Sequence, residues 1–206
     1  MLDGHFRKRL DPWLDRGGRD LAVRGIGANT VTITGFLIGL AAAIAIVLDS
    51  YVWAFVLIGA SRICDGLDGA VARATQKTDF GGFLDIVLDF AFYGLIPFAF
   101  ILADPYENGV AGGFLLLSFY INGSSFLAFS IMAEKRGLST GVRGAKSLYF
   151  TTGLAEATET IAVFLAFCLF PQWFCEIAVI FALVCFYTAL SRIMLARASF
   201  KAETQA

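Results

Sequence analysis

Aspartates gather in one stretch of an otherwise apolar chain. Residues 65–89 read DGLDGAVARATQKTDFGGFLDIVLD and carry Asp65, Asp68, Asp79, Asp85 and Asp89. The flanking sequence is as apolar as a membrane-spanning helix, where a lone carboxylate costs roughly 2.5 kcal/mol or more. Several carboxylates in such a setting require a partner, and a cation is the obvious one.

The spacing of these aspartates predicts a metal site between two helices. Asp65 and Asp68 stand at i and i+3, and Asp85 and Asp89 at i and i+4, so each pair projects from one face of its helix. Two facing helices would form a cage of four carboxylates. Hard oxygen ligands suit Mg2+, Mn2+ or Ca2+ and argue against zinc or copper. The alternative is a soluble helix pair that carries these aspartates on a loop or on its surface.

The other residues of the stretch are small or cationic. Gly66, Gly69, Ala70 and Ala72 allow a ligand or a neighbouring backbone to come close. Arg73 offers a planar fork of donors that matches a phosphate group. Carboxylates, a wall of small residues and an arginine together indicate a site for a metal-bound phosphate ester.

This stretch resembles the signature of the class I CDP-alcohol phosphotransferase (CDP-alcohol phosphatidyltransferase) family. The signature is D, any two, DG, any two, AR, a spacer, G, any three, D, any three, D. The chain matches every specified position, with Asp65, Asp68, Gly69, Ala72, Arg73, Gly81, Asp85 and Asp89. A pattern with this many fixed positions is far more specific than a lone glycine motif.

The resemblance implies an enzyme of phospholipid biosynthesis. Such an enzyme would transfer a phosphatidyl group from CDP-diacylglycerol to the hydroxyl of an alcohol acceptor and release CMP. One or two Mg2+ or Mn2+ ions would be the cofactor. The family also forms homodimers through its transmembrane helices, so a homodimer is expected, with membrane lipids as its surroundings and no nucleic acid as a partner.

The resemblance also implies roles for individual residues. Asp65, Asp68 and Asp85 would be the main metal ligands. Asp89 would complete the ligand set and take the proton of the acceptor hydroxyl as the general base. Four signature residues would hold the CDP moiety, namely Gly69, Ala72, Arg73 and Gly81.

The composition places the chain in a bilayer. Hydrophobic residues make up 58% of the 206 residues, charged residues make up only 16%, and the mean hydropathy is +0.73. A soluble domain carries far more charge. The single histidine, His5, lies in a basic N-terminal segment, and the four cysteines show no metal-binding spacing, so a zinc site is not expected.

Six apolar segments of about 20 residues are each long enough to cross the hydrocarbon core. They predict an all-α integral membrane protein, a single domain over 1–206 with a six-helix bundle over 30–196. Residues 2–23 read as an amphipathic helix on an anionic membrane surface, interrupted by Pro12 and by Gly17 and Gly18, or else as an exposed soluble arm. The predicted spans are 30–48, 51–73, 79–102, 110–133, 147–170 and 172–196, with an acidic turn at 103–109.

The basic residues orient the six spans. One side receives the N-terminal segment, the link between the second and third spans, the loop between the fourth and fifth, and the C-terminus. Every lysine and arginine except Arg62 lies in one of these segments or at the end of a span that adjoins one. The positive-inside rule therefore places both termini in the cytoplasm, with the protein in a bacterial-type inner membrane. Asp65 then lies about 12 Å in from Arg73 along its helix.

The acceptor alcohol is left open by the sequence. The loop between the fourth and fifth spans offers cations that could bind a phosphate, although ordinary positive-inside charge is the favoured explanation of them. Two glutamates at i and i+3 of the fifth span are suited to a polyol, an amino-alcohol or a packing contact with an arginine. The candidate acceptor residues are Arg62, Lys135, Arg136, Arg143, Lys146, Glu156 and Glu159.

Two other classes of membrane protein bury carboxylates in helices. Intramembrane prenyltransferases use aspartate-rich helices and Mg2+ to bind a pyrophosphate, but they lack the DG, any two, AR element. A divalent-cation transporter would have no need of Arg73 beside its carboxylates. Within the enzyme interpretation, water in place of an alcohol would make the protein a hydrolase.

Overall fold

The chain folds as a set of packed helices. The structure is a computed structural model, and it describes residues 3–136 and 154–201, within which no strand occurs. The helices are α1 (Asp3–Val23), α2 (Ala28–Val47), α3 (Tyr51–Ala74), α4 (Asp79–Ala103), α5 (Pro105–Lys135), α7 (Ala157–Leu169), the short 3-10 helix η1 (Pro171–Trp173) and α8 (Phe174–Lys201). The predicted all-α class is confirmed for these residues.

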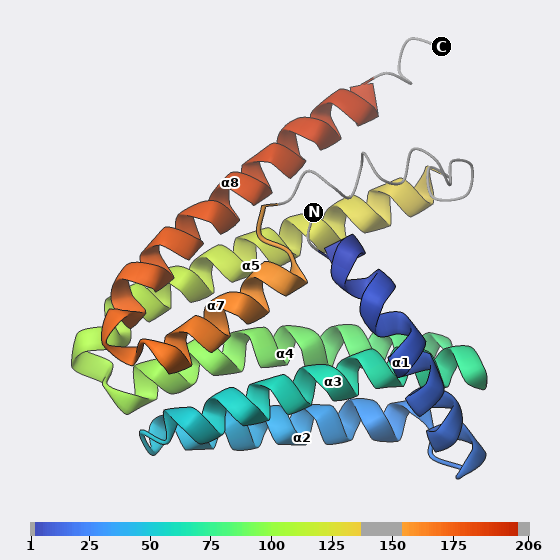
Figure 1. The fold of residues 1–206 in the computed structure, drawn as a ribbon. Helices are drawn as coiled ribbons and strands as arrows, with labels where there is room; N and C mark the ends of the chain where they lie inside the picture. The colour runs from blue at the N-terminus through green and yellow to red at the C-terminus, as the bar shows by residue number, and fades with distance from the viewer. Residues whose placement is uncertain (1–2, 137–153, 202–206) are drawn as a thin grey trace.

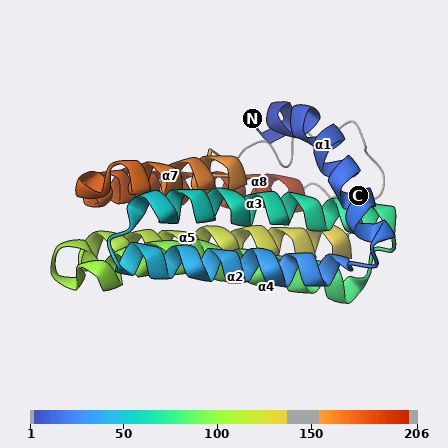
Figure 2. The same cartoon turned by 60° about the horizontal axis from the view of Figure 1, so that its bottom comes forward.

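The helices form two neighbouring groups. In both views α2, α3 and α4 run alongside one another and form the first group (Figure 1, Figure 2). Helices α5 and α8 pack against each other and form the second group. Helix α5 contacts α4, and α7 contacts both α3 and α8. Helix α1 crosses α3 at the end of the bundle where α3 ends and α4 begins. The two halves of the aspartate stretch are thus antiparallel neighbours joined by a short turn.

Aromatic side chains fill the core where the two groups meet. Phe92 and Phe100 of α4, Phe164 and Phe167 of α7, and Phe174 of α8 are all fully buried. The rings of Phe100 and Phe174 stack with centroids 4.7 Å apart, and Phe167 lies 5.5 Å from Phe100. Offset and edge-on ring contacts of this kind add to the stabilisation from buried area. This core fixes α4, and therefore its aspartates, relative to the second group.

Among the residues that the structure describes, four helical segments are long and apolar enough to cross a membrane: α2, α4, α5 and the segment Pro171–Phe200 that contains α8. Many of their large apolar side chains are exposed on the outside of the bundle, among them Leu37, Phe83, Leu117 and Ile180. Helix α3 has the length of a span but carries the charged residues of the signature. Helix α7 has only 13 residues. The coarse membrane prediction is confirmed, whereas the six-span count stays a prediction.

Three predicted boundaries are wrong. The fifth span does not form a helix at 154–156, and α7 begins at Ala157. The acidic turn at 103–109 is mostly helical, because Asp104 caps α5 by accepting hydrogen bonds from the amides of Tyr106 (3.1 Å) and Glu107 (3.0 Å). The N-terminal helix is continuous through Pro12 and the two glycines.

The Asp104 cap gives a test of stability alone. Replacing Asp104 with alanine removes the acceptor of two amides at the start of α5. We expect a loss of about 1 kcal/mol in the free energy of unfolding, seen as a lower thermal midpoint of the purified protein in detergent. Binding of a divalent cation to the signature aspartates, measured below that midpoint, should be unchanged, since the cap lies at the end of α4 remote from these residues.

Candidate active site

Three of the signature aspartates converge between α3 and α4. Carboxylate oxygens of Asp65, Asp68 and Asp85 all lie within 4.8 Å of one another. Asp65 and Asp68 lie one helical turn apart on α3, and Asp85 faces them from the second turn of α4. The sequence prediction that the two helices turn their aspartates toward one space is confirmed for these three residues.

The space between the three carboxylates fits a small cation. The cavity there has a volume of ≈ 10 Å³, which is about what one water molecule needs. Asp68 is 6% exposed, and its Oδ2 is buried without a hydrogen-bond partner in the described part of the chain. A buried carboxylate oxygen needs a donor or a metal. All the converging atoms are hard oxygen ligands, which suits Mg2+ or Mn2+.

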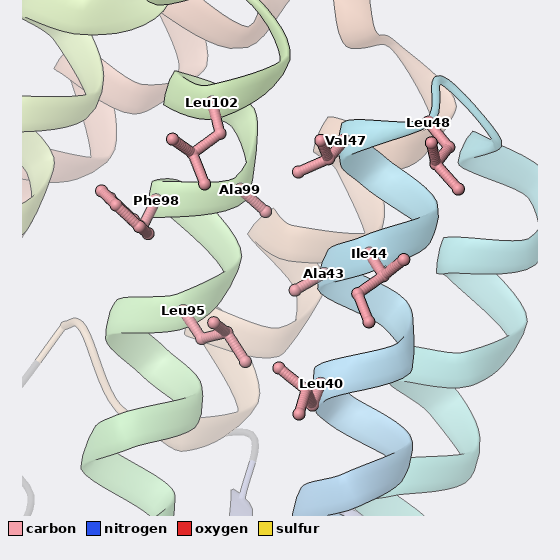
Figure 3. Close-up of a pocket in the computed structure, with 9 residues that line it drawn as sticks. All are labelled: Leu40, Ala43, Ile44, Val47, Leu48, Leu95, Phe98, Ala99 and Leu102. Carbon is pink, nitrogen blue, oxygen red and sulfur yellow. The ribbon is translucent and has the colours of Figure 1, made fainter.

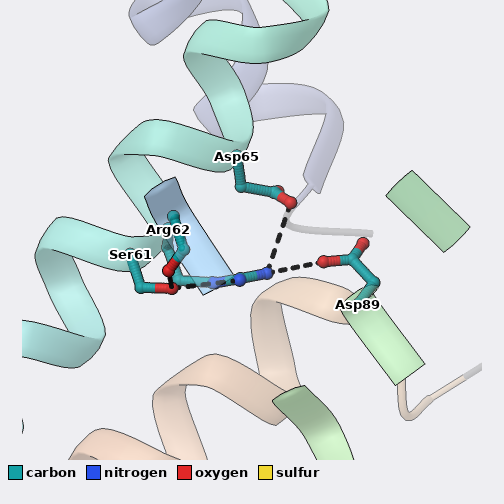
Figure 4. A network of polar contacts seen from close by, with 5 residues as sticks. Ser61, Arg62, Asp65 and Asp89 are labelled. Atoms are coloured by element: carbon teal, nitrogen blue, oxygen red, sulfur yellow. Dashed lines mark hydrogen bonds and ion pairs between the residues drawn. The ribbon is translucent and has the colours of Figure 1, made fainter. Parts of the chain in front are cut away.

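Asp89 lies beside this cluster and pairs with an arginine (Figure 4). Arg62 Nη1 donates to Asp89 Oδ1 at 2.8 Å and lies 3.4 Å from Asp65 Oδ1. Arg62 Nη2 donates to Ser61 Oγ at 3.2 Å, and that hydroxyl in turn donates to the carbonyl of Gly35 at 2.7 Å. The guanidinium carbon also lies 4.0 Å from the centroid of the Phe92 ring. The arginine outside the signature is therefore built into the site.

Small residues of α2 allow the three helices to come this close. A Cβ atom on Gly35 would lie 2.9 Å from Cys64 Cβ of α3, and one on Gly39 would lie 2.6 Å from the Phe92 ring of α4. Gly35 and Gly39 therefore form a close-packing face on α2. This face lets α2 pack against both aspartate-bearing helices and line the aspartate cavity between them.

Helix α1 packs against α3 near the turn between α3 and α4. A Cβ on Gly18 would lie 2.6 Å from Ala70 Cβ and 2.7 Å from the Ala70 backbone carbon, so α1 approaches α3 at the signature itself. At the same contact Arg73 Nη2 pairs with Asp15 Oδ1 at 2.7 Å. The signature arginine is therefore oriented by a residue of α1.

The contact at Gly18 can be tested by adding one methyl group. In a Gly18→Ala variant the methyl would meet backbone atoms of α3, which cannot turn aside. We expect α1 to separate from α3 at a cost of about 1–3 kcal/mol, with faster amide hydrogen exchange in α1. The control is Gly59→Ala in α3, where nothing lies within 4 Å of the added carbon. Equal exchange rates in the two variants would show that this contact does not hold α1.

The residues expected to hold CDP lie along the same end of the bundle. The position of a Cβ on Gly69 is 3.4 Å from Nη1 of Arg73, and a Cβ on Gly81 would lie 3.0 Å from Asn29 Oδ1 of α2. Ala72 is half-buried on α3 beside Arg73. Asn29 lies inside α2 and does not cap it, since Gly27 is the N-cap. Its amide faces the signature glycine instead.

The candidate acceptor residues are spread more widely. Among those that the structure describes, only Arg62 lines the aspartate cavity. Lys135 ends α5, and Arg136 Nη1 donates to the carbonyl of Phe200 at 3.1 Å. Glu156 is the N-cap of α7 and Glu159 lies in its first turn, so the two do not form the predicted i and i+3 pair within a helix. Arg143 and Lys146 fall outside the described residues.

The suggestion that Glu156 or Glu159 pairs with Arg62 is not supported, because the partners of Arg62 are Asp65 and Asp89. Glu156 interacts electrostatically with Arg192 of α8 instead. Arg192 Nη1 also donates to Asn122 Oδ1 (2.9 Å) and Ser125 Oγ (2.6 Å) of α5. This partly buried polar cluster joins α5 to α8.

Comparison with known sequences places this geometry in a family. The sequence model of the CDP-alcohol phosphatidyltransferase family matches residues 26–190, which include every aspartate of the signature. The chain belongs to the CDP-alcohol phosphatidyltransferase family. The protein is accordingly a membrane-bound transferase of substituted phosphate groups.

Relatives of this transferase differ in what their names state. "Inner membrane protein YnjF" of Escherichia coli K12 is 47% identical over 193 residues, which is 94% of each chain. "Archaetidylinositol phosphate synthase" of Methanothermobacter thermautotrophicus is 32% identical over 92% of this chain and 89% of its own. "CDP-diacylglycerol--serine O-phosphatidyltransferase" of Methanocaldococcus jannaschii is 40% identical over 41% of this chain and 38% of its own.

Two polar residues of the site were not singled out from the sequence. Thr32 of α2 and Ser61 of α3 both line the aspartate cavity. Ser61 is fully buried and Thr32 is 9% exposed. Thr32 lies on the face of α2 that carries Gly35, and Ser61 directly precedes Arg62. A hydroxyl residue at such a position in an apolar helix is the signal that could have identified each of them.

A second cavity of the transferase has no polar lining. It lies between α2 and α4, toward the C-terminal ends of both helices, and has a volume of ≈ 230 Å³ (Figure 3). Leucine, isoleucine, valine, alanine and phenylalanine side chains surround it, among them Leu40, Ile44, Leu95 and Phe98. It offers no group for catalysis or for binding a phosphate, so the aspartate cavity remains the candidate active site.

Proposed function

We propose that this transferase moves a phosphatidyl group from CDP-diacylglycerol to the hydroxyl of an alcohol and releases CMP. The convergence of Asp65, Asp68 and Asp85 at a cation-sized space carries the proposal, together with the membership of the family. The site lies within helices long enough to cross the membrane and near one end of the bundle. A lipid donor and a water-soluble alcohol can both reach such a place.

Asp65, Asp68 and Asp85 would hold the divalent cation, Mg2+ or Mn2+. When bound, the cation supplies positive charge that neutralises the pyrophosphate of the donor and the charge that develops on CMP. Arg73 would contribute a second positive group to the donor, and Gly69, Ala72 and Gly81 leave room for the CDP moiety. Because Arg73 pairs with Asp15, α1 would help to place the nucleotide.

Asp89 would act as the general base. The acceptor oxygen forms a bond to the phosphorus of the phosphatidyl group, and the bond from that phosphorus to the bridging oxygen breaks. CMP leaves with the electron pair, and the hydroxyl proton passes to Asp89. The Asp89 side chain is 28% exposed and borders the cavity, so an alcohol can approach it. A positioned carboxylate base contributes about 10²–10⁴-fold to such a step.

The proposal also includes the arrangement of the chain in the membrane. We propose six spans, in which α3 and α7 are added to the four long apolar helices. The spans would lie in the inner membrane of a bacterial-type cell, with both termini in the cytoplasm. Helix α1 would lie along the membrane surface, where Trp13, 71% exposed, is suited to the interface. Two copies of the chain would form a homodimer through their transmembrane helices.

The acceptor would bind near the end of α5 and the start of α7. The proposed contacts are Lys135, Arg136, Arg143, Lys146, Glu156 and Glu159, with Arg62 at the floor of the site. The relatives named for archaetidylinositol phosphate and for serine differ in the alcohol that their names give. The choice of alcohol therefore depends on this outer part of the site rather than on the aspartates.

An acceptor screen tests the proposal. Purified protein would be given CDP-diacylglycerol, Mg2+ or Mn2+, and separately glycerol 3-phosphate, inositol phosphate, serine, choline, ethanolamine or phosphatidylglycerol. We expect metal-dependent release of CMP and a new lipid with one alcohol. Release of CMP with phosphatidic acid as the lipid product would identify a hydrolase. Consumption of a prenyl pyrophosphate, or uptake of Mn2+ into vesicles without release of CMP, would favour the two other classes.

A further inference from the structure

Helix α1 packs one of its faces on the half of α3 that carries the signature (Figure 1). A Cβ on Gly17 would lie 3.0 Å from Leu67 Cδ2, and a Cβ on Gly66 would lie 2.9 Å from Leu14 Cδ1. Together with the close approach of Gly18 described above, these contacts seat α1 on α3 over a full helical turn. We call this side of α1 its inner face.

The opposite side of α1, its outer face, is exposed and carries an aromatic ring and cations. Trp13 is largely exposed, and the guanidinium carbon of Arg16 lies 5.5 Å from the centroid of its ring. Arg19 is exposed on the same helix, and Arg24 is exposed directly after its end. Asp20 is the only acidic residue between Arg16 and Arg24, so this stretch is net positive. Tryptophan and arginine together suit the surface of a membrane with anionic headgroups.

An ion pair connects α1 to the place proposed for the donor. Arg73 Nη2 donates to Asp15 Oδ1 at 2.7 Å, and Nη1 of the same guanidinium lies 3.4 Å from the position of a Cβ on Gly69. Asp15 therefore holds one amino group of Arg73 and leaves the other beside a glycine proposed to contact the CDP moiety. The two side chains are 40% and 47% exposed. Their pairing thus depends on α1 staying seated on α3 and not on burial.

We propose that α1 couples the charge of the surrounding membrane to binding of the donor. Anionic phospholipids hold the outer face of α1, which keeps its inner face seated on α3 and keeps Arg73 paired with Asp15. Where the headgroups are neutral, α1 separates from α3 more readily and Arg73 loses its partner. Asp15 is therefore a positioning residue that acts through Arg73. This inference rests on the proposed function for the identity of the donor.

The test measures binding of CDP, in the presence of Mn2+, to the full-length protein in lipid nanodiscs. The discs contain phosphatidylcholine alone or with about one third phosphatidylserine, which makes their surface negative. In the anionic discs the wild-type protein should bind CDP about threefold more tightly than Asp15→Asn, as expected for an exposed ion pair. In the neutral discs the two proteins should bind CDP equally. Comparing proteins within one disc composition cancels the direct effect of the headgroups on CDP and Mn2+.

Variants of the outer face separate the two parts of the coupling. Asp20→Asn removes the same charge from the same helix, but Asp20 is exposed on the outer face and the partner of Arg73 is Asp15. This control should bind CDP like the wild-type protein in both discs. The double variant Arg16→Gln with Arg19→Gln should bind CDP in the anionic discs no more tightly than Asp15→Asn. Amide hydrogen exchange in α1 should be slower in anionic than in neutral discs for the wild-type protein, and equal in both for the double variant.

Turnover gives a readout that a general loss of structure would not reproduce. In anionic membranes Asp15→Asn should raise the KM for CDP-diacylglycerol about threefold and leave kcat within about twofold, because the contact that is lost serves binding. Asp15→Glu keeps a carboxylate within reach of Arg73 and should recover most of the affinity. A fall in kcat without a rise in KM would overturn the role of Asp15 in positioning.

Failure of the inference and failure of the proposed function are distinguishable. Equal binding of CDP by the wild-type protein and Asp15→Asn in the anionic discs would overturn the inference, and so would tighter binding by the variant. The same difference between the two proteins in both discs would also overturn it, because membrane charge would then play no part. If the wild-type protein binds CDP in the expected pattern but transfers no phosphatidyl group to any alcohol, the proposed function fails and the coupling stands.

Discussion

An Asp68→Asn variant should lose phosphatidyl transfer while the metal-free protein becomes more stable. Asp68 is buried against Asp65 and Asp85, and one of its oxygens has no partner in the described residues. The amide keeps the shape of the side chain but removes a metal ligand. We expect the rate of CMP release to fall at least about 1,000-fold, which corresponds to the loss of several kcal/mol of transition-state stabilisation.

The opposite change in stability separates this effect from misfolding. Relieving the repulsion among three close carboxylates by about 1 kcal/mol should raise the thermal midpoint of the metal-free variant by about 2–4 °C. Added Mn2+ should raise the midpoint of the wild-type protein and not that of the variant, since only bound ligand stabilises the folded state.

The control is Asp79→Asn. Asp79 belongs to the same stretch of sequence, but it begins α4 and is exposed, outside the cluster. This variant should keep both transfer and the response to Mn2+. A metal-dependent rise in the midpoint of Asp68→Asn would contradict the assignment of Asp68 as a ligand.

The periodicity of the sequence was sufficient to predict the core of the site. Aspartates at i and i+3 on one helix and four residues apart on the next leave one arrangement in which neither pair faces lipid. The structure adopts that arrangement for Asp65, Asp68 and Asp85. The same spacing placed Arg62 on the face of Asp65. Helical period and the cost of burying charge decide such features locally, so they can be read without knowing the fold.

The rest depends on tertiary contacts that a pattern does not contain. Spacing cannot tell which aspartate Arg62 selects, because that follows from the packing of Phe92 against the guanidinium and of α2 against both helices. The continuity of α1 through Gly17 and Gly18 depends on their contact with α3, whereas locally two glycines favour a break. The late start of α7 depends on Thr188 of α8. Its Oγ1 accepts hydrogen bonds from the backbone amides of Leu154 and Ala155, both at 3.2 Å, which holds these residues outside the helix.

An Asp89→Asn variant should separate catalysis from metal binding. Asp89 borders the cavity but pairs with Arg62 and lies outside the three-carboxylate cluster. Asparagine cannot accept the proton of the acceptor hydroxyl, so we expect kcat to fall about 1,000-fold. The KM for CDP-diacylglycerol should change by less than about threefold, since the donor's contacts are made elsewhere.

Binding of Mn2+ to this variant decides between the two roles that Asp89 can have. Retained affinity is the result expected for a general base that lies outside the three-carboxylate cluster. A loss of affinity comparable to that of Asp68→Asn would instead make Asp89 a fourth ligand, as the signature alone suggests. Because asparagine keeps the size of the side chain and can still accept a hydrogen bond from Arg62, the packing around Phe92 should persist, and a thermal midpoint close to that of the wild-type protein would verify this.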